Sequence, residues 1–358
     1  MVVRVDLQGS LFGETEHPIC QSSELSASAF RYPGGVAALR VRNTRGEITV
    51  LPYQGQQIWR AGFDGRGLTM RSLFDHPVPT QVYLETYGAF LIHCGLAGLG
   101  APGPGDTHPL HGELPNAPYQ TAWLEVSEGK SLSVAGTYQH SVAFSTNYRA
   151  TVCTTLSAGS ALIDVSIEIE NLKRTPMDLM YLAHANFLPV DHGELHYTAD
   201  YTPEAVRVRR SVPAHITPPA GYLDFIEDLA RDPAVHHVLR PGLAFDPEAV
   251  FEIDPKPDPQ GFAHALQRHP DGTADYIRFR PAQTSMCTRW ICRTPDQEGI
   301  GIAFPSTAGV EGYSAEKAKG RVLTLEGGAR WRADITLGLL TAEETGQALE
   351  TIQRAKAN

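Results

Sequence analysis

The chain is poor in cysteine, and its cysteines are scattered. It has 358 residues and five cysteines, Cys20, Cys94, Cys153, Cys287 and Cys292, none of which forms a C-x-x-C pair. An odd, scattered set argues against a disulfide framework and against a zinc knuckle. The sequence therefore predicts reduced thiols that are mostly buried, Cys94 among them.

Long apolar runs and an excess of positive charge are also absent. No apolar stretch reaches the roughly 18 residues of a transmembrane helix, and the first residues lack the basic and apolar regions of a signal peptide. Aspartate and glutamate number 40 against 30 lysines and arginines, which gives a net charge of −10. This balance argues against a nucleic-acid or anionic-membrane partner. We expect a cytoplasmic protein whose oligomeric state the sequence leaves open.

The chain does have period-two alternation of apolar and polar residues. The clearest case is residues 163–170, IDVSIEIE, a pattern typical of a half-buried antiparallel strand. A turn-rich run follows, and then residues 177–187 are largely apolar, which indicates a strand covered on both faces. We expect these two strands to pair as a hairpin. Further strands are predicted at 36–41, 47–51, 131–136, 276–279 and 330–339.

Many strands and few helices favour an all-β sandwich or barrel. Residues 202–260 interrupt the alternation with frequent prolines around one predicted helix at 222–231, and we interpret them as a long ordered excursion from the sheet. Thr341 and Glu344 predict a capping box at the start of a peripheral C-terminal helix. Without a linker or an internal repeat, residues 1–358 are expected to form a single domain.

Two histidine neighbourhoods carry the candidate chemistry. The stretch HPLHGELPN places His111 and Glu113 between prolines that exclude a helix. His184 and Asn186 are two residues apart on a predicted strand, so their side chains share a face. An imidazole next to a carboxylate suits general acid–base catalysis. Buried and hydrogen-bonded core histidines would explain the same pattern.

Other residue types in the chain suit ligand binding less specifically. Trp59 and Arg60 offer an aromatic platform and a cation for a sugar, as do Arg289 and Trp290, although a strand edge followed by a turn explains the first pair equally well. Imidazoles and carboxylates could also bind zinc, manganese or iron, but their spacing matches no metal motif, and no cofactor or metal is predicted. The residues considered for a metal are His93, Asp106, His108, His111, Glu113, His184, Asp191 and His192.

The order of the motifs resembles that of the aldose 1-epimerases (galactose mutarotases) and their uncharacterised bacterial relatives. The motifs are Leu110-His111-Gly112, the later strand with His184, and a closing segment that includes Val310-Glu311-Gly312. Together they extend the resemblance over about residues 27–340. The resemblance implies a β-supersandwich with a few short peripheral helices and a small-molecule carbohydrate partner. It also implies that a general acid and a general base open and reclose the sugar ring.

The resemblance also implies residue roles. His184 matches the general acid, and His111 matches the histidine that binds and polarises the sugar. Asn186, Arg60, Trp59 and Glu311 are the further candidates for contacts with the substrate.

The resemblance departs from the family at the general base. In the family the base is a glutamate on a late strand, and Phe304 of the stretch GIAFP stands at its place. A phenylalanine cannot take a proton. Either Glu113, Glu311 or Glu316 substitutes, with Glu113 the first candidate because it is close to His111, or the chain no longer catalyses mutarotation. Glu316 has an alternative as a solvated charge beside lysines.

The sequence therefore predicts a carbohydrate mutarotase or epimerase that interconverts sugar anomers. A sugar-binding protein without catalysis is one alternative, and a metal-dependent sugar isomerase or lyase on the same fold is another. The sequence does not identify the sugar.

Overall fold

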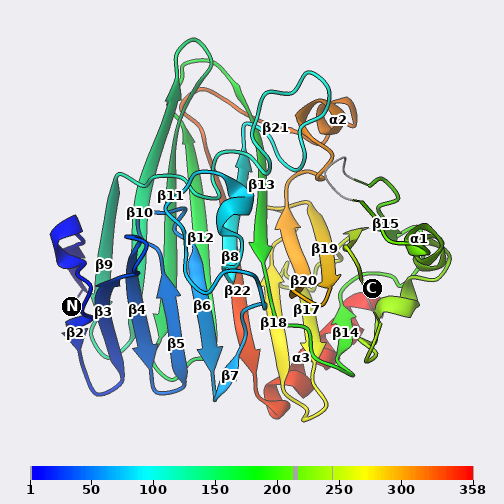
Figure 1. Cartoon of the computed structure of the whole chain (residues 1–358), viewed down its shortest axis with the longest axis horizontal. Helices are drawn as coiled ribbons and strands as arrows, with labels where there is room; N and C mark the ends of the chain where they lie inside the picture. Colours follow the sequence, from blue (N-terminus) through cyan, green and yellow to red (C-terminus); the bar gives the residue numbers. More distant parts are fainter. Residues whose placement is uncertain (1, 213–216, 244, 358) are drawn as a thin grey trace.

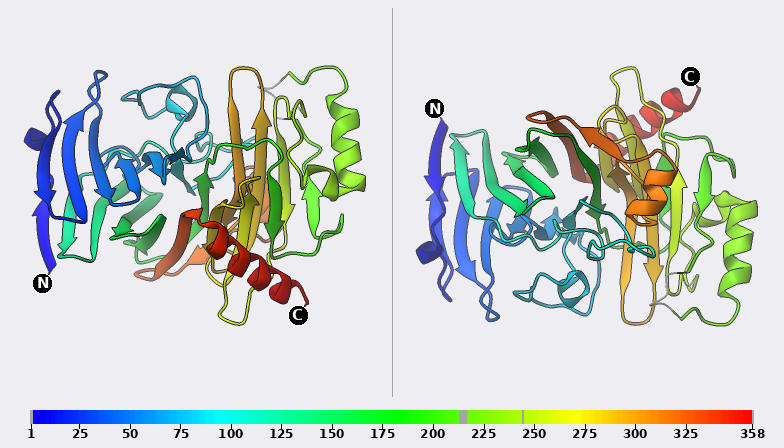
Figure 2. Two further views of the ribbon diagram at one scale, coloured as in Figure 1. Left: turned by 90° about the horizontal axis from the view of Figure 1, so that it is seen from below. Right: turned by 90° about the horizontal axis from the view of Figure 1, so that it is seen from above.

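Two large antiparallel β-sheets form the body of the molecule (Figure 1). The computed structural model describes residues 2–212, 217–243 and 245–357. Within these residues a nine-stranded and a thirteen-stranded sheet lie as two layers, as the views of Figure 2 show. The predicted all-β class is confirmed.

The nine-stranded sheet contains the predicted alternating strand near its middle. In β12 the side chains of Ile163, Val165, Ile167 and Ile169 are buried, and the residues between them face outward. The strands in spatial order are β1 (Val2–Asp6), β9 (Thr121–Ser127), β10 (Ser131–Val142), β11 (Thr146–Ser157), β12 (Leu162–Asn171), β22 (Arg330–Leu340), β18 (Ala274–Phe279), β17 (Ala263–Arg268) and β14 (Glu194–Tyr197).

The thirteen-stranded sheet carries the strand with His184 at its centre. In spatial order its strands are β15 (Val206–Val208), β16 (Ala249–Ile253), β19 (Met286–Arg293), β20 (Glu298–Ser306), β13 (Met177–Ala185), β8 (Leu91–Leu96), β6 (Ile58–Phe63), β5 (Gly46–Val50), β4 (Ala37–Asn43), β3 (Leu25–Arg31) and β2 (His17–Gln21). Two short strands join beside them, β21 (Leu323–Leu325) on β13 and β7 (Arg66–Gly67) on β6.

The predicted hairpin between 163–170 and 177–187 is wrong, although both strands exist. β12 pairs with β11 and β22 in one sheet, whereas β13 pairs with β8 and β20 in the other. The turn-rich run between them crosses from one layer to the other, where the amide of Asn171 donates to the carbonyls of Thr175 and Leu325 at 3.0 and 2.9 Å. β13 is buried on both faces, so it needs a neighbouring strand of its own sheet at each edge. β12 belongs to the other, half-exposed sheet and cannot be one of these neighbours.

The helices are few and peripheral, as expected. They are α1 (Tyr222–Arg231), α2 (Tyr313–Ala318) and α3 (Ala342–Ala357), with short 3₁₀ turns at Gly9–Leu11, Tyr83–Thr86 and Pro233–His236. α1 covers the residues predicted for it. The capping box of α3 is confirmed: the Thr341 amide donates to the Glu344 carboxylate at 2.8 Å, and the Glu344 amide donates to the Thr341 hydroxyl at 3.2 Å.

The proline-rich excursion at 202–260 adds two strands to the edge of the large sheet. β15 and β16 pair with each other, and β16 pairs with β19. α1 and the 3₁₀ turn at Pro233–His236 lie between them in the chain, on the right of Figure 1. Residues 213–216 and 244 of the excursion lie outside the described residues. This arrangement places β16 beside β19, which pairs with β20. β20 in turn is the neighbour of β13, the strand that carries His184.

Candidate functional site

His184 and Asn186 lie at the end of β13, and the structure joins their side chains directly. His184 Nδ1 is 2.6 Å from Asn186 Oδ1, and the Asn186 amide nitrogen donates to the carbonyl of Ala89 at 2.9 Å. Because that donation turns the amide oxygen toward the imidazole, Nδ1 must carry the proton. A neutral His184 then presents Nε2 as a proton acceptor.

The surroundings of His184 favour this neutral form. The imidazole is buried, and burial is the main cause that lowers its pKa well below the ordinary histidine value of 6.5, with the nearby His111 acting in the same direction. The hydrogen bond to Asn186 opposes the shift only partly. At neutral pH the imidazole of His184 is therefore uncharged, and its Nε2 can accept a proton.

The loop with His111 is held rigidly against β8. His111 has a left-handed backbone (φ 59°), its carbonyl accepts from the Gly95 amide at 2.8 Å, and its own amide donates to Gly100 at 3.0 Å. Gly112 follows at φ 77°, where a Cβ would lie 2.3 Å from the carbonyl oxygen of Gly95. The ring of His111 lies 5.8 Å from that of His184, nearly perpendicular to it. The structure thus brings the two histidine motifs together.

The two histidines line a cavity of about 340 Å³. Its wall is mostly apolar and aromatic, and it is formed by β13, β20 and β19, by the loops before and after β8, and by the excursion. The lining residues are Leu73, Phe74, Tyr83, Leu84, Tyr87, Gly100, Ala101, Leu110, His111, Leu182, His184, Arg209, Pro247, Glu248, Val250, Thr288, Trp290, Cys292, Gln297, Phe304 and Val310. A small organic ligand fits this volume.

Phe304, on β20, occupies the space beside His184. The two ring centroids are 4.0 Å apart and the rings are inclined by 37°. The position that the resemblance gives to a glutamate base is therefore filled by an aromatic ring in contact with the imidazole. Any carboxylate that acts on a ligand here has to come from another part of the cavity wall.

Glu248 is the carboxylate that lines the cavity, and sequence reasoning missed it. One carboxylate oxygen pairs with Arg209 at 2.5 Å, and the other accepts from the Trp290 indole at 2.7 Å. The hydroxyl of Tyr222 holds the Glu248 carbonyl at 2.9 Å. Glu248 directly precedes β16 in the proline-rich excursion, and no spacing rule links it to His184. The available signal was a carboxylate at the start of an apolar run within a long, ordered excursion.

Glu113 points away from the cavity and binds the neighbouring loops. Its carboxylate accepts from the Ala97 amide at 3.1 and 3.3 Å and from the Tyr148 hydroxyl at 3.0 Å. Burial raises the pKa of Glu113, against opposing effects from His140 and from the hydrogen bonds. Glu113 is absent from the cavity lining, so the structure does not place its carboxylate with the two histidines.

Trp59 and Arg60 lie behind the cavity wall. The guanidinium of Arg60 stacks on the Trp59 ring at 4.6 Å and donates to the carbonyls of Gly88 and Phe74 at 2.8 and 2.9 Å. Trp59 is fully buried. Both side chains hold the loop that supplies Phe74 and Tyr87 to the cavity, and neither lines it.

The two late glutamates considered as bases also lie outside the cavity lining. Glu311 accepts from the Ser211 hydroxyl at 3.2 Å, next to the lining residue Val310. The Glu316 carboxylate is buried, pairs with Lys319 at 2.7 Å and accepts from a backbone amide. The expectation of a solvated Glu316 is wrong, because the ion pair and the backbone donor stabilise the carboxylate inside the fold.

Within the described ranges, no three histidine, cysteine or acidic side chains are grouped so that they could hold a metal ion. Of the residues considered for a metal, Asp106 and His108 lie 3.7 Å apart, and others contact different parts of the chain. His93 lies 2.8 Å from the Tyr181 hydroxyl, and Asp191 pairs with Arg293 at 2.7 Å. Cys94 is buried as predicted, and burial raises the pKa of its thiol.

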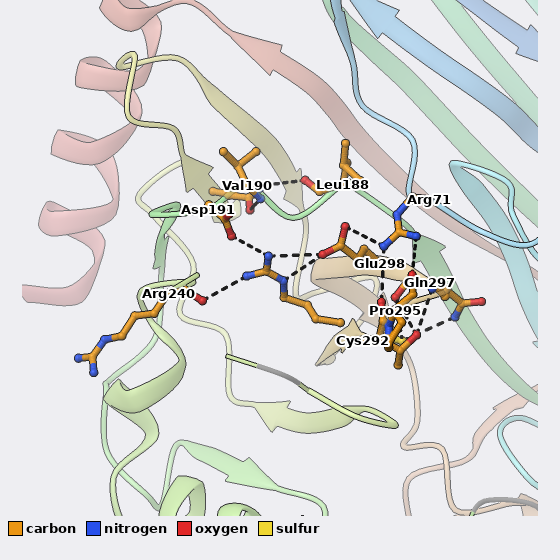
Figure 3. Close-up of polar contacts among 12 residues, drawn as sticks. Arg71, Leu188, Val190, Asp191, Arg240, Cys292, Pro295, Gln297 and Glu298 are labelled. Atoms are coloured by element: carbon orange, nitrogen blue, oxygen red, sulfur yellow. Dashed lines mark hydrogen bonds and ion pairs between the residues drawn. The ribbon is translucent and has the colours of Figure 1, made fainter. Parts of the chain in front are cut away.

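The turn between β19 and β20 is fixed beside the cavity by polar contacts (Figure 3). Arg71 pairs with Glu298 at 3.2 Å and donates to the Pro295 carbonyl at 2.9 Å. Gln297 lies 3.7 Å from the Cys292 sulfur, and both residues line the cavity. The part of the wall that contains Cys292 and Gln297 is therefore held in place by contacts that join distant parts of the chain.

Solved structures share this two-sheet arrangement. A protein from Klebsiella pneumoniae, provisionally named an aldose 1-epimerase, superimposes with a TM-score of 0.81 at 18% identity, over 99% of this chain and 96% of that one. A galactose mutarotase-like protein from Clostridium acetobutylicum gives 0.61 at 12% identity, over 89% and 99% of the two chains. The chain has the galactose mutarotase-like fold. A galactose 1-epimerase from Lactobacillus acidophilus gives 0.52 at 12% identity, over 95% and 98%.

Comparison of sequences gives less information about this chain than comparison of structures. A family model described as a domain of unknown function, DUF4432, matches residues 34–197. That stretch contains His111 and His184 but ends before Glu248 and Phe304. No curated protein matches the chain in sequence. Among the described residues, no helix is long and apolar enough to cross a membrane.

Proposed function

We propose that the chain binds a small carbohydrate in this cavity and interconverts its anomers. The observation that carries the proposal is the pair of His184 and His111 in one cavity on a galactose mutarotase-like fold. Ring opening needs a group that takes the proton of the anomeric hydroxyl and another that gives a proton to the ring oxygen. Two imidazoles about one sugar ring apart suit that pair of tasks.

The tautomer of His184 suggests which task it performs. Its Nδ1 proton is committed to Asn186 and its pKa is low, so Nε2 accepts the anomeric proton. His111 delivers a proton to the ring oxygen, the bond between that oxygen and the anomeric carbon breaks, and the aldehyde forms. Rotation and reclosure with both transfers reversed yield the other anomer. This assignment differs from the general-acid role that the resemblance implies for His184.

Anomer exchange measured by NMR tests the proposal. In a panel of aldoses, sugar acids and sugar phosphates, pure anomers of at least one sugar should equilibrate faster with the protein than without it. Replacement of His184 by alanine should reduce the acceleration by roughly 10²- to 10⁴-fold, the usual contribution of acid–base catalysis. His192→Asn is the matched control, because His192 is exposed and its left-handed backbone (φ 62°) tolerates asparagine. No acceleration across the panel would refute mutarotation.

A sugar-binding protein without catalysis is the second candidate. The contact between Phe304 and His184 favours it, since the ring stands where the resemblance expects the base. Calorimetry on the same panel separates the two functions. Sugar binding without anomer exchange would favour this candidate over mutarotation.

A further inference from the structure

The wall around His184 is unusually apolar for a site that receives a sugar. The rings of Phe304, Trp290 and Tyr87 lie 4.0, 5.6 and 5.7 Å from the imidazole of His184. Leu182 completes this part of the lining. A sugar hydroxyl that turned toward these side chains would lose its water without gaining a hydrogen bond, at a considerable cost.

The charges in the cavity neutralise each other. Arg209 and Glu248 form an ion pair at 2.5 Å, and the indole of Trp290 donates to the second carboxylate oxygen. Both charged side chains are mostly buried, with 16% and 20% of their surfaces exposed. A phosphate or carboxylate on the ligand would have to displace Glu248 from Arg209 or remain close to its negative charge. The site therefore favours a neutral ligand.

Several polar side chains of the lining can bind hydroxyls, among them those of Tyr83 and Gln297. Thr288 lines the cavity, and its hydroxyl is buried without a hydrogen-bond partner in the described part of the chain. Nε2 of His184 and the outer lone pairs of Glu248 are further partners. A hydroxyl that faced the rings of Phe304 and Trp290 would still be left unpaired. A sugar that lacks this one hydroxyl matches the wall better.

We propose that the ligand of this cavity is a neutral deoxy sugar. Its deoxygenated carbon lies against Phe304 and Trp290, and one hydroxyl bonds to the free hydroxyl of Thr288. The inference rests on the proposed function in that the ligand is a carbohydrate. It goes beyond that function by naming the class.

Matched pairs of sugars test the inference on the wild-type protein. The pairs are D-galactose with 6-deoxy-D-galactose, and D-ribose with 2-deoxy-D-ribose; D-glucose 6-phosphate is the anionic probe. Calorimetry should show at least one deoxy member binding about tenfold or more tightly than its parent, the usual discrimination of an apolar pocket. The phosphate should bind more weakly than either neutral pair. Parents that bind as well as their deoxy partners, or a preferred sugar phosphate, would overturn the inference.

The same samples separate this inference from the proposed function. Anomer exchange of the parent sugars without a deoxy preference would support mutarotation and overturn the ligand class. A deoxy preference in binding without any anomer exchange would support the ligand class and overturn mutarotation. Binding of none of these sugars would overturn the deoxy-sugar inference.

Three variants test which residues of the wall cause the preference. Phe304→Asn should reduce the ratio of affinities between deoxy and parent sugar, because it adds polar partners beside His184, whereas Phe304→Leu should keep the ratio. Equal ratios in both variants would contradict the assigned contact. Thr288→Val should weaken binding of both members of a pair. If a variant fails to fold, the wild-type comparison still decides the proposal.

Discussion

Burial of the imidazole sets the pH range in which His184 can accept a proton. Because burial lowers the pKa of His184 well below 6.5, the neutral form persists at mildly acidic pH. We therefore expect kcat/KM for anomer exchange to show no decline on the acidic side as the pH falls to about 6, past the ordinary histidine pKa. A decline centred near 6.5 would contradict the assignment of His184 as the proton acceptor.

Asn186→Asp should move the acidic decline in activity to higher pH. A carboxylate at 2.6 Å from Nδ1 would stabilise the charged imidazole and raise the pKa of His184. The variant should lose activity at pH 6 relative to pH 8, whereas the wild type should not. The pH profile of kcat/KM measures this effect, and NMR of the His184 ring nitrogens reports the protonation directly. An unchanged profile would show that His184 does not exchange the relevant proton.

The ion pair of Glu248 and Arg209 allows a test of whether the cavity excludes charged ligands. Glu248→Gln keeps an acceptor for Trp290 and removes the negative charge that Arg209 neutralises. We expect the variant to bind a sugar phosphate about tenfold or more tightly than the wild type, as measured by calorimetry. Glu227→Gln is the matched control, because Glu227 pairs with Arg210 at 3.1 Å on the exposed surface. Equal phosphate affinities in both variants would contradict the prediction.

At the scale of elements, Glu113 anchors the loop that carries His111. Glu113→Ala would leave the Ala97 amide and the Tyr148 hydroxyl without their partner, at a cost of about 1–3 kcal/mol. Glu113→Gln keeps an acceptor and should lose less stability in urea unfolding. It should also keep most of the anomer-exchange activity, as expected for an anchor. A Gln variant that folds normally but loses activity as severely as His184→Ala would instead make Glu113 the base.

Local patterns predicted single elements well and their pairing less well. The alternation of 163–170 and the capping box at Thr341 depend on neighbours in sequence, and both are confirmed. The hairpin between β12 and β13 was wrong because pairing depends on which sheet receives each strand. Proximity in sequence also misled the search for a base. Glu113 is two residues from His111 and faces away, whereas Glu248 reaches the cavity from a distant strand.

At the scale of the whole molecule, buried histidines couple stability to pH. Burial lowers the pKa of His93 to about 4 and lowers those of His184 and His236 well below 6.5. Between these values and about 6.5 the unfolded chain binds more protons than the folded one. The stabilisation is therefore complete above about pH 6.5 and is lost as the pH falls. Glu113 has a raised pKa, so around its own titration the folded chain binds more protons than the unfolded one, and its contribution to stability increases as the pH falls.

We expect the free energy of unfolding to decrease by several kcal/mol between pH 7 and pH 4.5, at up to about 1.4 kcal/mol per pH unit for each histidine. Urea unfolding at a series of pH values measures this slope. His93→Asn keeps a partner for Tyr181 and should reduce the slope by about one proton. A free energy that does not change with pH would contradict the prediction.

The edge position of β15 and β16 has a consequence for how the cavity can diversify. The histidines are encoded before residue 198, whereas Arg209, Pro247, Glu248 and Val250 reach the cavity from two strands that touch the rest of their sheet through β19 alone. The residues between these two strands also contact β14 and β19, where the amides of Leu195 and Arg293 donate to the carbonyls of His237 and Phe245 at 2.8 and 3.1 Å. The proposed proton-transfer pair and the wall proposed to select the ligand therefore lie in different parts of the chain, and grafting residues 206–253 from a homologue that keeps these contacts offers a route to new sugar selectivity with the same chemistry.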